Sequence, residues 1–215
     1  MSSNKYGYIA DTGPEQAFRS NTGVFNPADI NELIAENKWT NFGQLELIET
    51  QTVTSTISAV EFKNLGNYNV HFLAQSNVDL DTDGSFTQVQ LSSDGGTSYT
   101  TTGYQYARQR NYISSGTGYA QEGKSTNTSL VAQLGSSGTS SNEKGNSYAY
   151  LYNLLDSTKY SFGTFQAISV SSTDLDSYFG AGVLPTAAAH NAIRITANSG
   201  DIEGMNISLY GIRFA

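Results

Sequence analysis

The sequence contains no cysteine among its 215 residues. Disulfide bonds and thiolate metal sites are therefore excluded. Charged side chains are also scarce, at 14% of the chain, against about 25% in an average soluble domain. The surface must take most of its polarity from serine, threonine, asparagine and glutamine.

Proline is rare as well, with three residues, whereas the chain has 21 glycines, 14 tyrosines and 10 phenylalanines. Aromatic side chains suit the half-buried surface of a pleated sheet, and glycines suit turns and bulges. This composition is typical of a β-rich protein.

Basic residues are few and scattered. Lysine and arginine number 11 against 19 acidic residues, for a formal net charge of −8, and the densest basic spot is the pair Arg108 and Arg110. Such a chain repels a phosphate backbone, so we expect no nucleic-acid partner. No apolar run approaches the roughly 20 residues that span a bilayer, and the N-terminus lacks the apolar centre of a signal peptide. We therefore expect a protein made in a cytoplasm, with no membrane insertion.

The hydrophobic period divides the chain into two regions. Residues 1–25 show no sustained period and are expected to form an extended arm. A helix is predicted over residues 27–37, because Pro27 suits the first helical position and apolar residues recur on one face. Residues 1–44 are therefore expected to serve attachment or oligomerisation.

From residue 45 onward the apolar period becomes two, in short runs separated by turn residues. We expect eight to ten strands with no helices between them. The chain is thus predicted to be all-β: an antiparallel β-sandwich or jelly roll over residues 45–215, preceded by the N-terminal arm and its one short helix.

Three local features of residues 45–215 predict particular turns, bulges or loops. Asp94-Gly95-Gly96 predicts a hairpin. Gly211 interrupts the alternation of the last strand and predicts a bulge there. Residues 114–127 and 135–147, rich in glycine and serine, are expected to be long surface loops.

The stretch GYAQEGKS matches the phosphate-binding pattern G-x-x-x-x-G-K-S, with Gly118, Gly123, Lys124 and Ser125 at the defining positions. A phosphate-binding loop needs a strand before it and a helix N-terminus after it. The following residues read as a strand instead. We interpret the match as accidental and expect no bound cofactor.

The stretch DLDTDG resembles the first half of a calcium-binding loop through Asp79, Asp81 and Asp83. The closing position is Gln90, where such loops have a bidentate glutamate. These three aspartates are therefore a weak metal candidate, and a solvated acidic turn is the preferred interpretation.

The sequence contains few residues in arrangements suited to catalysis. It has no G-x-S-x-G elbow, and His71 and His190 have neither a cysteine nor a third histidine with which to bind zinc. Sequence cannot select a glycosidase pair from 19 acidic residues. We expect a protein that is not an enzyme.

Tyr148, Tyr150 and Tyr152 project from one face of a predicted strand, with Ala149 and Leu151 on the other. Tyrosine offers rigid, amphipathic contact area, so this row is a candidate contact for a glycan or a protein. Packing inside the sheet or at a subunit interface is the preferred interpretation.

Several stretches together resemble a known class of proteins. They are YGYIADTGPEQAFRSNTGVFNPADINELIAENKWTNFGQLELIETQTVT, YNVHFL, YQYARQ, NEKGNSYAYLYNLLDSTKYSF, FGAGVLPTAAAHNAIRI and the terminal ISLYGIR. The combination resembles β-sandwich virion structural proteins of tailed phages that infect marine bacteria, especially cyanophages. It covers nearly the whole chain, and the first and last stretches are the most specific.

The resemblance implies a virion component without catalytic residues, assembled in the host cytoplasm. Its expected partners are other virion proteins and further copies of itself, with a trimer as one candidate. Two functions stay open: an external head-decoration or tail or neck appendage component, or a glycan-binding module that recognises the host surface.

Overall fold

The computed structural model describes residues 27, 28, 30, 31, 45–113, 116–136, 138–171 and 174–212. The chain divides into two units, Met1–Gln44 and Leu45–Ala215. The four described residues of the first unit are helical. The rest of the helix predicted over 27–37, and the arm predicted over 1–25, lie outside the described residues.

The second unit is all-β, and its described part contains twelve strands. They are β1 (Leu45–Val53), β2 (Ala59–Phe62), β3 (Val70–Leu80), β4 (Phe86–Ser92), β5 (Tyr104–Ile113), β6 (Thr117–Asn127), β7 (Val131–Ser136), β8 (Gly145–Tyr152), β9 (Ser161–Ser171), β10 (Asp174–Leu184), β11 (Ala192–Ala197) and β12 (Ile202–Ile212). The expected eight to ten strands were too few.

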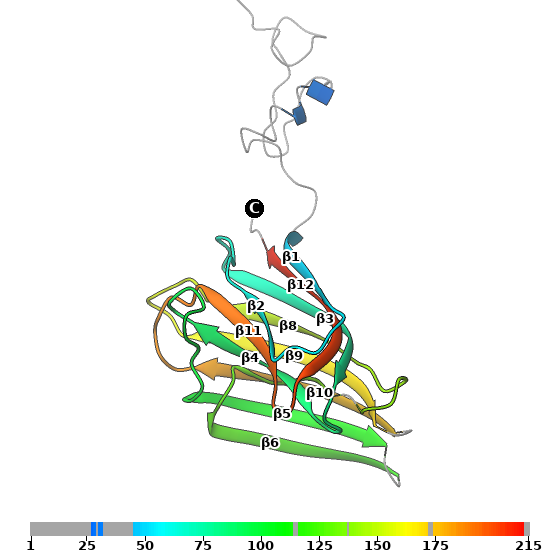
Figure 1. Ribbon diagram of the computed structural model, residues 1–215. Helices are drawn as coiled ribbons and strands as arrows, with labels where there is room; N and C mark the ends of the chain where they lie inside the picture. The colour runs from blue at the N-terminus through cyan, green and yellow to red at the C-terminus, as the bar shows by residue number, and fades with distance from the viewer. Residues whose placement is uncertain are drawn as a thin grey trace, which may run out of the picture. The chain divides into compact units, whose positions relative to one another are not determined.

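The strands form two antiparallel sheets that pack face to face as a β-sandwich (Figure 1). The larger sheet has the order β1-β12-β3-β8-β9-β10-β5-β6, and the smaller has the order β2-β11-β4-β7. The predicted antiparallel sandwich is confirmed.

The sandwich has the connectivity of a jelly roll once two inserted strand pairs are set aside. Without β5-β6 and β9-β10, the sheets read β1-β12-β3-β8 and β2-β11-β4-β7, and successive strands alternate between them except at β4 and β7. This is the double Greek key of a jelly roll. The inserted pairs lie next to each other and lengthen only the larger sheet, of which β5 and β6 form the lower end in Figure 1.

The hydrophobic core lies between the sheets and follows the period-two pattern of the strands. Met205, Ile207 and Leu209 of β12 are buried there, as are Ala149 and Leu151 of β8. The sequence alternation that predicted these strands is therefore the alternation between core and outer face.

Two of the local expectations are wrong. Asp94-Gly95-Gly96 forms a turn, but it joins β4 of the smaller sheet to β5 of the larger one, so it closes no hairpin. Gly211 is paired regularly on both sides, with Glu46 and His71. A Cβ there would lie 2.3 Å from the Tyr68 ring, so the glycine serves close packing rather than a bulge.

The irregularities of the large sheet lie elsewhere. The pairing of β1 with β12 shifts between Leu47 and Glu49, and the pairing of β3 with both of its neighbours shifts around Asn77. Asn77 has a φ of 54°, and its amide donates to Asn146 Oδ1 at 3.2 Å. Asparagine tolerates this left-handed backbone better than most residues, which fits it to a bulge.

The predicted loops were also too long. Residues 117–127 form strand β6, β7 continues to Ser136, and β8 begins at Gly145. Glycine and serine made β6 look irregular, but it pairs with β5 along its length as the edge strand of the large sheet. An edge strand needs no strong apolar pattern, because it is covered less than a central one.

Candidate functional site

The large sheet has an outer face, which points away from the smaller sheet. Four rows of directly opposed residues cross it. The rows are Thr50, Ser208, Ala74, Tyr148, Gln166, Phe179, Gln109 and Gln121; Leu47, Tyr210, Phe72, Tyr150, Thr164, Ala181, Ala107 and Gly123; Leu45, Ile212, Val70, Tyr152, Phe162, Val183 and Gln105; and Asn146, Ile168, Ser177, Asn111 and Tyr119. We define these residues, with Ile113 and Leu175 on the same sides of β5 and β10, as the outer face.

The outer face is uncharged and exposes large apolar side chains. No residue in the four rows is aspartate, glutamate, lysine or arginine. Ten large hydrophobic side chains are exposed in the described part of the chain, and nine of them lie on this face: Leu45, Leu47, Ile113, Tyr119, Tyr148, Phe162, Ile168, Leu175 and Phe179. Single exposed hydrophobic residues are ordinary, whereas a continuous group marks an interaction site.

The predicted tyrosine row lies on this outer face. Tyr148 is 39% exposed, while Tyr150 and Tyr152 are half-buried. The Phe72 ring centroid lies 5.9 Å from that of Tyr148 and 5.0 Å from that of Tyr150, and Tyr150 stacks on Tyr152 at 6.5 Å. The row points away from the smaller sheet, so packing between the two sheets is not its role.

A shallow hollow of about 310 Å³ opens in the outer face beside Tyr148. It is lined by Gln75, Ser76, Asn146, Ser147, Tyr148, Gln166, Ala167 and Ile168. The Tyr148 hydroxyl donates to Gln166 Oε1 at 2.6 Å. Amide groups, a phenol and an aliphatic wall can meet the hydroxyl groups and the apolar faces of an uncharged ligand.

Sequence analysis found the tyrosines but missed the residues that complete the face. Gln166 and Phe179 come from β9 and β10, and each lies in the same row as Tyr148. The alternation of each strand shows which residues share its face. The order in which strands pair cannot be read from that alternation, so the face could not be assembled from sequence.

Two of the three aspartates of the weak metal candidate have other partners. Asp79 forms an ion pair with Lys144. Asp81 Oδ1 accepts from the Asp201 amide and from the Thr82 hydroxyl, both at 2.9 Å. Within the residues that the structure describes, no group of three or more histidine, aspartate or glutamate side chains is placed to hold a metal ion.

The glycine-rich string Gly118–Ser125 lies inside strand β6, not in the surface loop that we expected. Gly123 pairs with Ala107 of β5, and Lys124 pairs with Tyr106. An extended antiparallel strand does not aim consecutive amides at one phosphate, as a turn before a helix does. The geometry needed for nucleotide binding is therefore absent from this segment.

Both histidines are buried and hydrogen-bonded. His71 Nε2 lies 2.8 Å from the Leu65 carbonyl oxygen, and His190 Nδ1 lies 2.9 Å from Ser161 Oγ. Burial lowers the pKa of each imidazole. The Ser161–His190 pair has the distance of a nucleophile and its base. However, both residues are buried, so a substrate could not reach the hydroxyl.

The opposite face of the inserted strands carries charged and aromatic side chains. Arg110 binds Asp176 through two hydrogen bonds of 2.9 and 2.8 Å, and its guanidinium carbon lies 4.9 Å from the Tyr112 ring centroid. The guanidinium carbon of Arg108 lies 5.6 Å from the Tyr106 ring centroid and 5.7 Å from that of Tyr178. These contacts cover part of the large sheet with paired charges and stacked rings.

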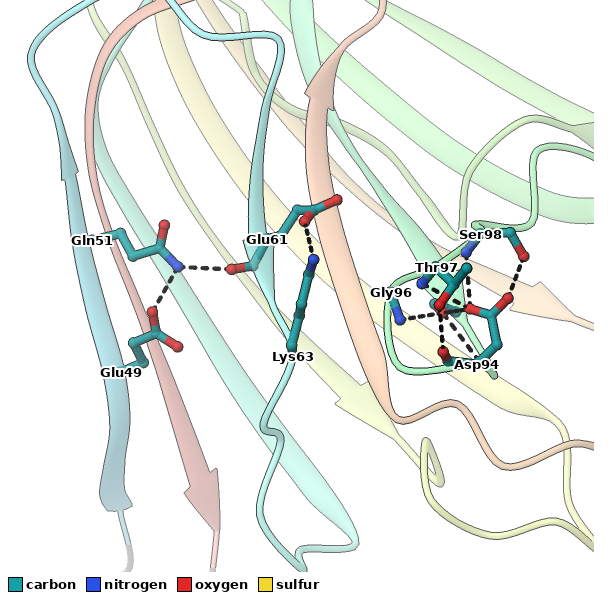
Figure 2. A network of polar contacts seen from close by, with 9 residues as sticks. Glu49, Gln51, Glu61, Lys63, Asp94, Gly96, Thr97 and Ser98 are labelled. Atoms are coloured by element: carbon teal, nitrogen blue, oxygen red, sulfur yellow. Dashed lines mark hydrogen bonds and ion pairs between the residues drawn. The ribbon is translucent and has the colours of Figure 1, made fainter.

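Acidic side chains near the smaller sheet also serve local structure (Figure 2). Gln51 Nε2 donates to Glu49 Oε1 at 2.7 Å and to the Glu61 carbonyl oxygen at 2.8 Å, which ties β1 to β2 across the two sheets. The Asp94 carboxylate accepts from the Ser98 amide and hydroxyl, and these bonds hold its pKa well below the usual range. The Asp94 carboxylate therefore stays ionised and holds its turn rather than moving protons.

Comparison with known proteins adds no relative: no family model matches the chain, and no curated protein matches its sequence. Among the described residues, no helix is long and apolar enough to cross a membrane. The outer face is therefore the strongest functional candidate that the structure offers.

Proposed function

We propose that this chain is a non-enzymatic structural protein of a bacteriophage particle, an external head-decoration component or part of a tail or neck appendage. The observation that carries this proposal is the uncharged outer face with its nine exposed hydrophobic side chains. Monomeric proteins rarely expose a continuous apolar patch larger than a few hundred Å². A surface of this kind fits a protein that works within an assembly.

In this proposal the two units of the chain have different roles. Residues 1–44 attach the protein to the particle or to further copies of itself, and residues 45–215 form the displayed sandwich. Its partners are then other virion proteins, and a homo-oligomer, with a trimer as one candidate. The resemblance of the chain to cyanophage virion proteins supports the same assignment, with assembly in the host cytoplasm.

A deletion of residues 1–25 tests this proposal. We expect the truncated protein to remain folded and soluble, with a melting temperature near that of the full chain, because residues 45–215 bury a core of their own between the two sheets. We expect it to fail to join the particle, as measured by mass spectrometry of particles assembled with each form. A truncated protein that unfolds, or one that is still incorporated, contradicts the proposal.

The hollow beside Tyr148 favours a second candidate function, the binding of an uncharged host-surface glycan. Aromatic and amide side chains surround it, and a tyrosine ring can stack on the apolar face of a sugar. Glycan-array binding of the full chain tests this candidate. Tyr148→Ala should abolish binding, whereas Tyr160→Ala, in the turn after β8, should leave it unchanged.

A further inference from the structure

The outer face has the size of a protein interface. Strands lie about 4.8 Å apart and rise about 3.3 Å per residue, so eight strands with about seven residues each cover roughly 900 Å². A standard interface buries about 800 Å² per partner. One whole partner could therefore lie on this face.

The charge distribution favours a second copy of this chain as the partner. The chain carries a net charge of −8, whereas the four rows of the outer face contain no charged residue. Because the chain as a whole is acidic, repulsion opposes the association of two copies, and it is weakest where the contact surface itself carries no charge. Two copies that meet through the outer face avoid burying any charge.

We propose that the outer face is the contact surface between two copies of this chain, which pack sheet against sheet. This inference rests on the proposed structural function and deepens it by naming the partner and the surface. Residues on a two-fold axis meet their own equivalents, so the contact needs a face that is complementary to itself. Rings and aliphatic side chains can interdigitate with their copies, and glutamine amides can pair with glutamine amides, since each carries both donors and acceptors.

The centre of the contact is the part of the face where Ile168 and Phe179 lie on neighbouring strands. Each side chain is 47% exposed; Ile168 is paired with Ser177 and Phe179 with Gln166, so the two are diagonal neighbours in adjacent rows. Tyr160 is also 47% exposed, but it lies in the turn between β8 and β9 and outside the four rows. It is therefore a matched control for a substitution at the centre.

Sedimentation equilibrium of the full chain with Ile168→Lys, Phe179→Lys and Tyr160→Lys tests the proposal. Each change makes the net charge less negative and so weakens repulsion between copies. We expect the dissociation constant to rise at least tenfold with Ile168→Lys or Phe179→Lys, because a lysine charge would be buried without a partner. Tyr160→Lys should leave it unchanged. Circular dichroism should be the same for all four proteins, since these side chains are exposed.

The outcomes separate this inference from the proposed function. A full chain that is monomeric at 100 μM, or an oligomer that both substitutions on the face leave intact, overturns the self-contact. Particle incorporation that still depends on residues 1–25 would then leave the structural function standing. If the full chain is a monomer that binds a glycan, and Ile168→Lys abolishes that binding, the self-contact is overturned and the face binds carbohydrate instead.

Discussion

At the scale of single residues, several positions are constrained by how close the chain segments approach. Gly182 of β10 faces the core, where the connection from β6 to β7 lies directly over it. An added Cβ would lie 1.8 Å from the Leu130 carbonyl oxygen. Because the contact is with backbone, the neighbour cannot turn aside as a side chain could.

Gly182→Ala should therefore destabilise the fold by about 2 kcal/mol or more, through forced separation of the two sheets. Gly204→Ala is the control, since a Cβ there would meet its nearest atom, Asp79 Cβ, at an ordinary 3.5 Å. Urea denaturation of both variants measures the difference. Equal stability of the two would show that the sheets can separate without cost.

The buried histidines predict a dependence of stability on pH. Burial lowers the pKa of His71 and His190 in the folded protein below the ordinary value of 6.5. The unfolded chain therefore takes up these protons first as the pH falls. Stability should be full above about pH 7 and should decline as the pH falls through 6.5 toward the lowered folded-state values, by at most about 1.4 kcal/mol per histidine per pH unit.

Urea denaturation at pH 7.5, 6.5 and 5.5 checks this expectation. His71→Gln should reduce the decline by about half, because a glutamine amide can still donate to the Leu65 carbonyl oxygen but does not titrate. An unchanged decline in this variant would assign the pH dependence to other groups.

At the scale of elements, an ion pair joins two of the inserted strands, β5 and β10. Asp176 of β10 has a side chain that is only 7% exposed, whereas its partner Arg110 of β5 is 40% exposed. Loss of the arginine leaves a buried carboxylate without its cation. Loss of the aspartate leaves an arginine that water can still reach.

Arg110→Ala should therefore cost more stability than Asp176→Ala, about 2 kcal/mol against about 1 kcal/mol. Thermal and urea denaturation of the two variants and of the double variant give the comparison. If the aspartate variant were the less stable one, the hydrogen bond from the Tyr178 hydroxyl to Asp176 would be the stronger contribution.

The connections between strands also show what could be predicted from the sequence and what could not. The hairpin of β8 and β9 around Asp156 could be predicted, because two alternating runs flank a short polar turn. The turn at residues 94–96 has equally strong turn residues, yet it joins different sheets. Turn residues determine that the chain reverses its direction. Side-chain packing determines which strand the following segment pairs with.

At the scale of the whole molecule, the two sheets of the sandwich are held together by one hydrophobic core. Among the described residues, the three aspartates of the DLDTDG stretch form no group placed to hold a metal ion; Asp79 is paired with Lys144, and Asp81 accepts from the Asp201 amide. Calcium therefore has no prepared site in this segment.

The melting temperature should be the same with calcium and with EDTA. A strong site saturated a hundredfold would add about 2.7 kcal/mol, which in a chain of this size raises the melting temperature by about 5 to 10 °C. Differential scanning calorimetry in 5 mM calcium and in EDTA distinguishes the two cases, and a rise of several degrees would contradict the expectation.

The sequence by itself determined the class of the fold and the two faces of most strands. Alternation in β8 and β12 separated buried residues such as Leu151 and Ile207 from outward residues such as Tyr150. The prediction of faces succeeds because successive side chains of a strand point to opposite faces, so alternate positions share a face.

Only the tertiary structure decided which outward residues became neighbours. Phe72, Tyr150 and Tyr210 form one row although they are far apart in the chain, and nothing in each strand's own pattern specifies its partner. The physical reason is that strand order is set by the packing of the two sheets as a whole. The outer face, and with it the candidate function, exists only once eight strands have been paired.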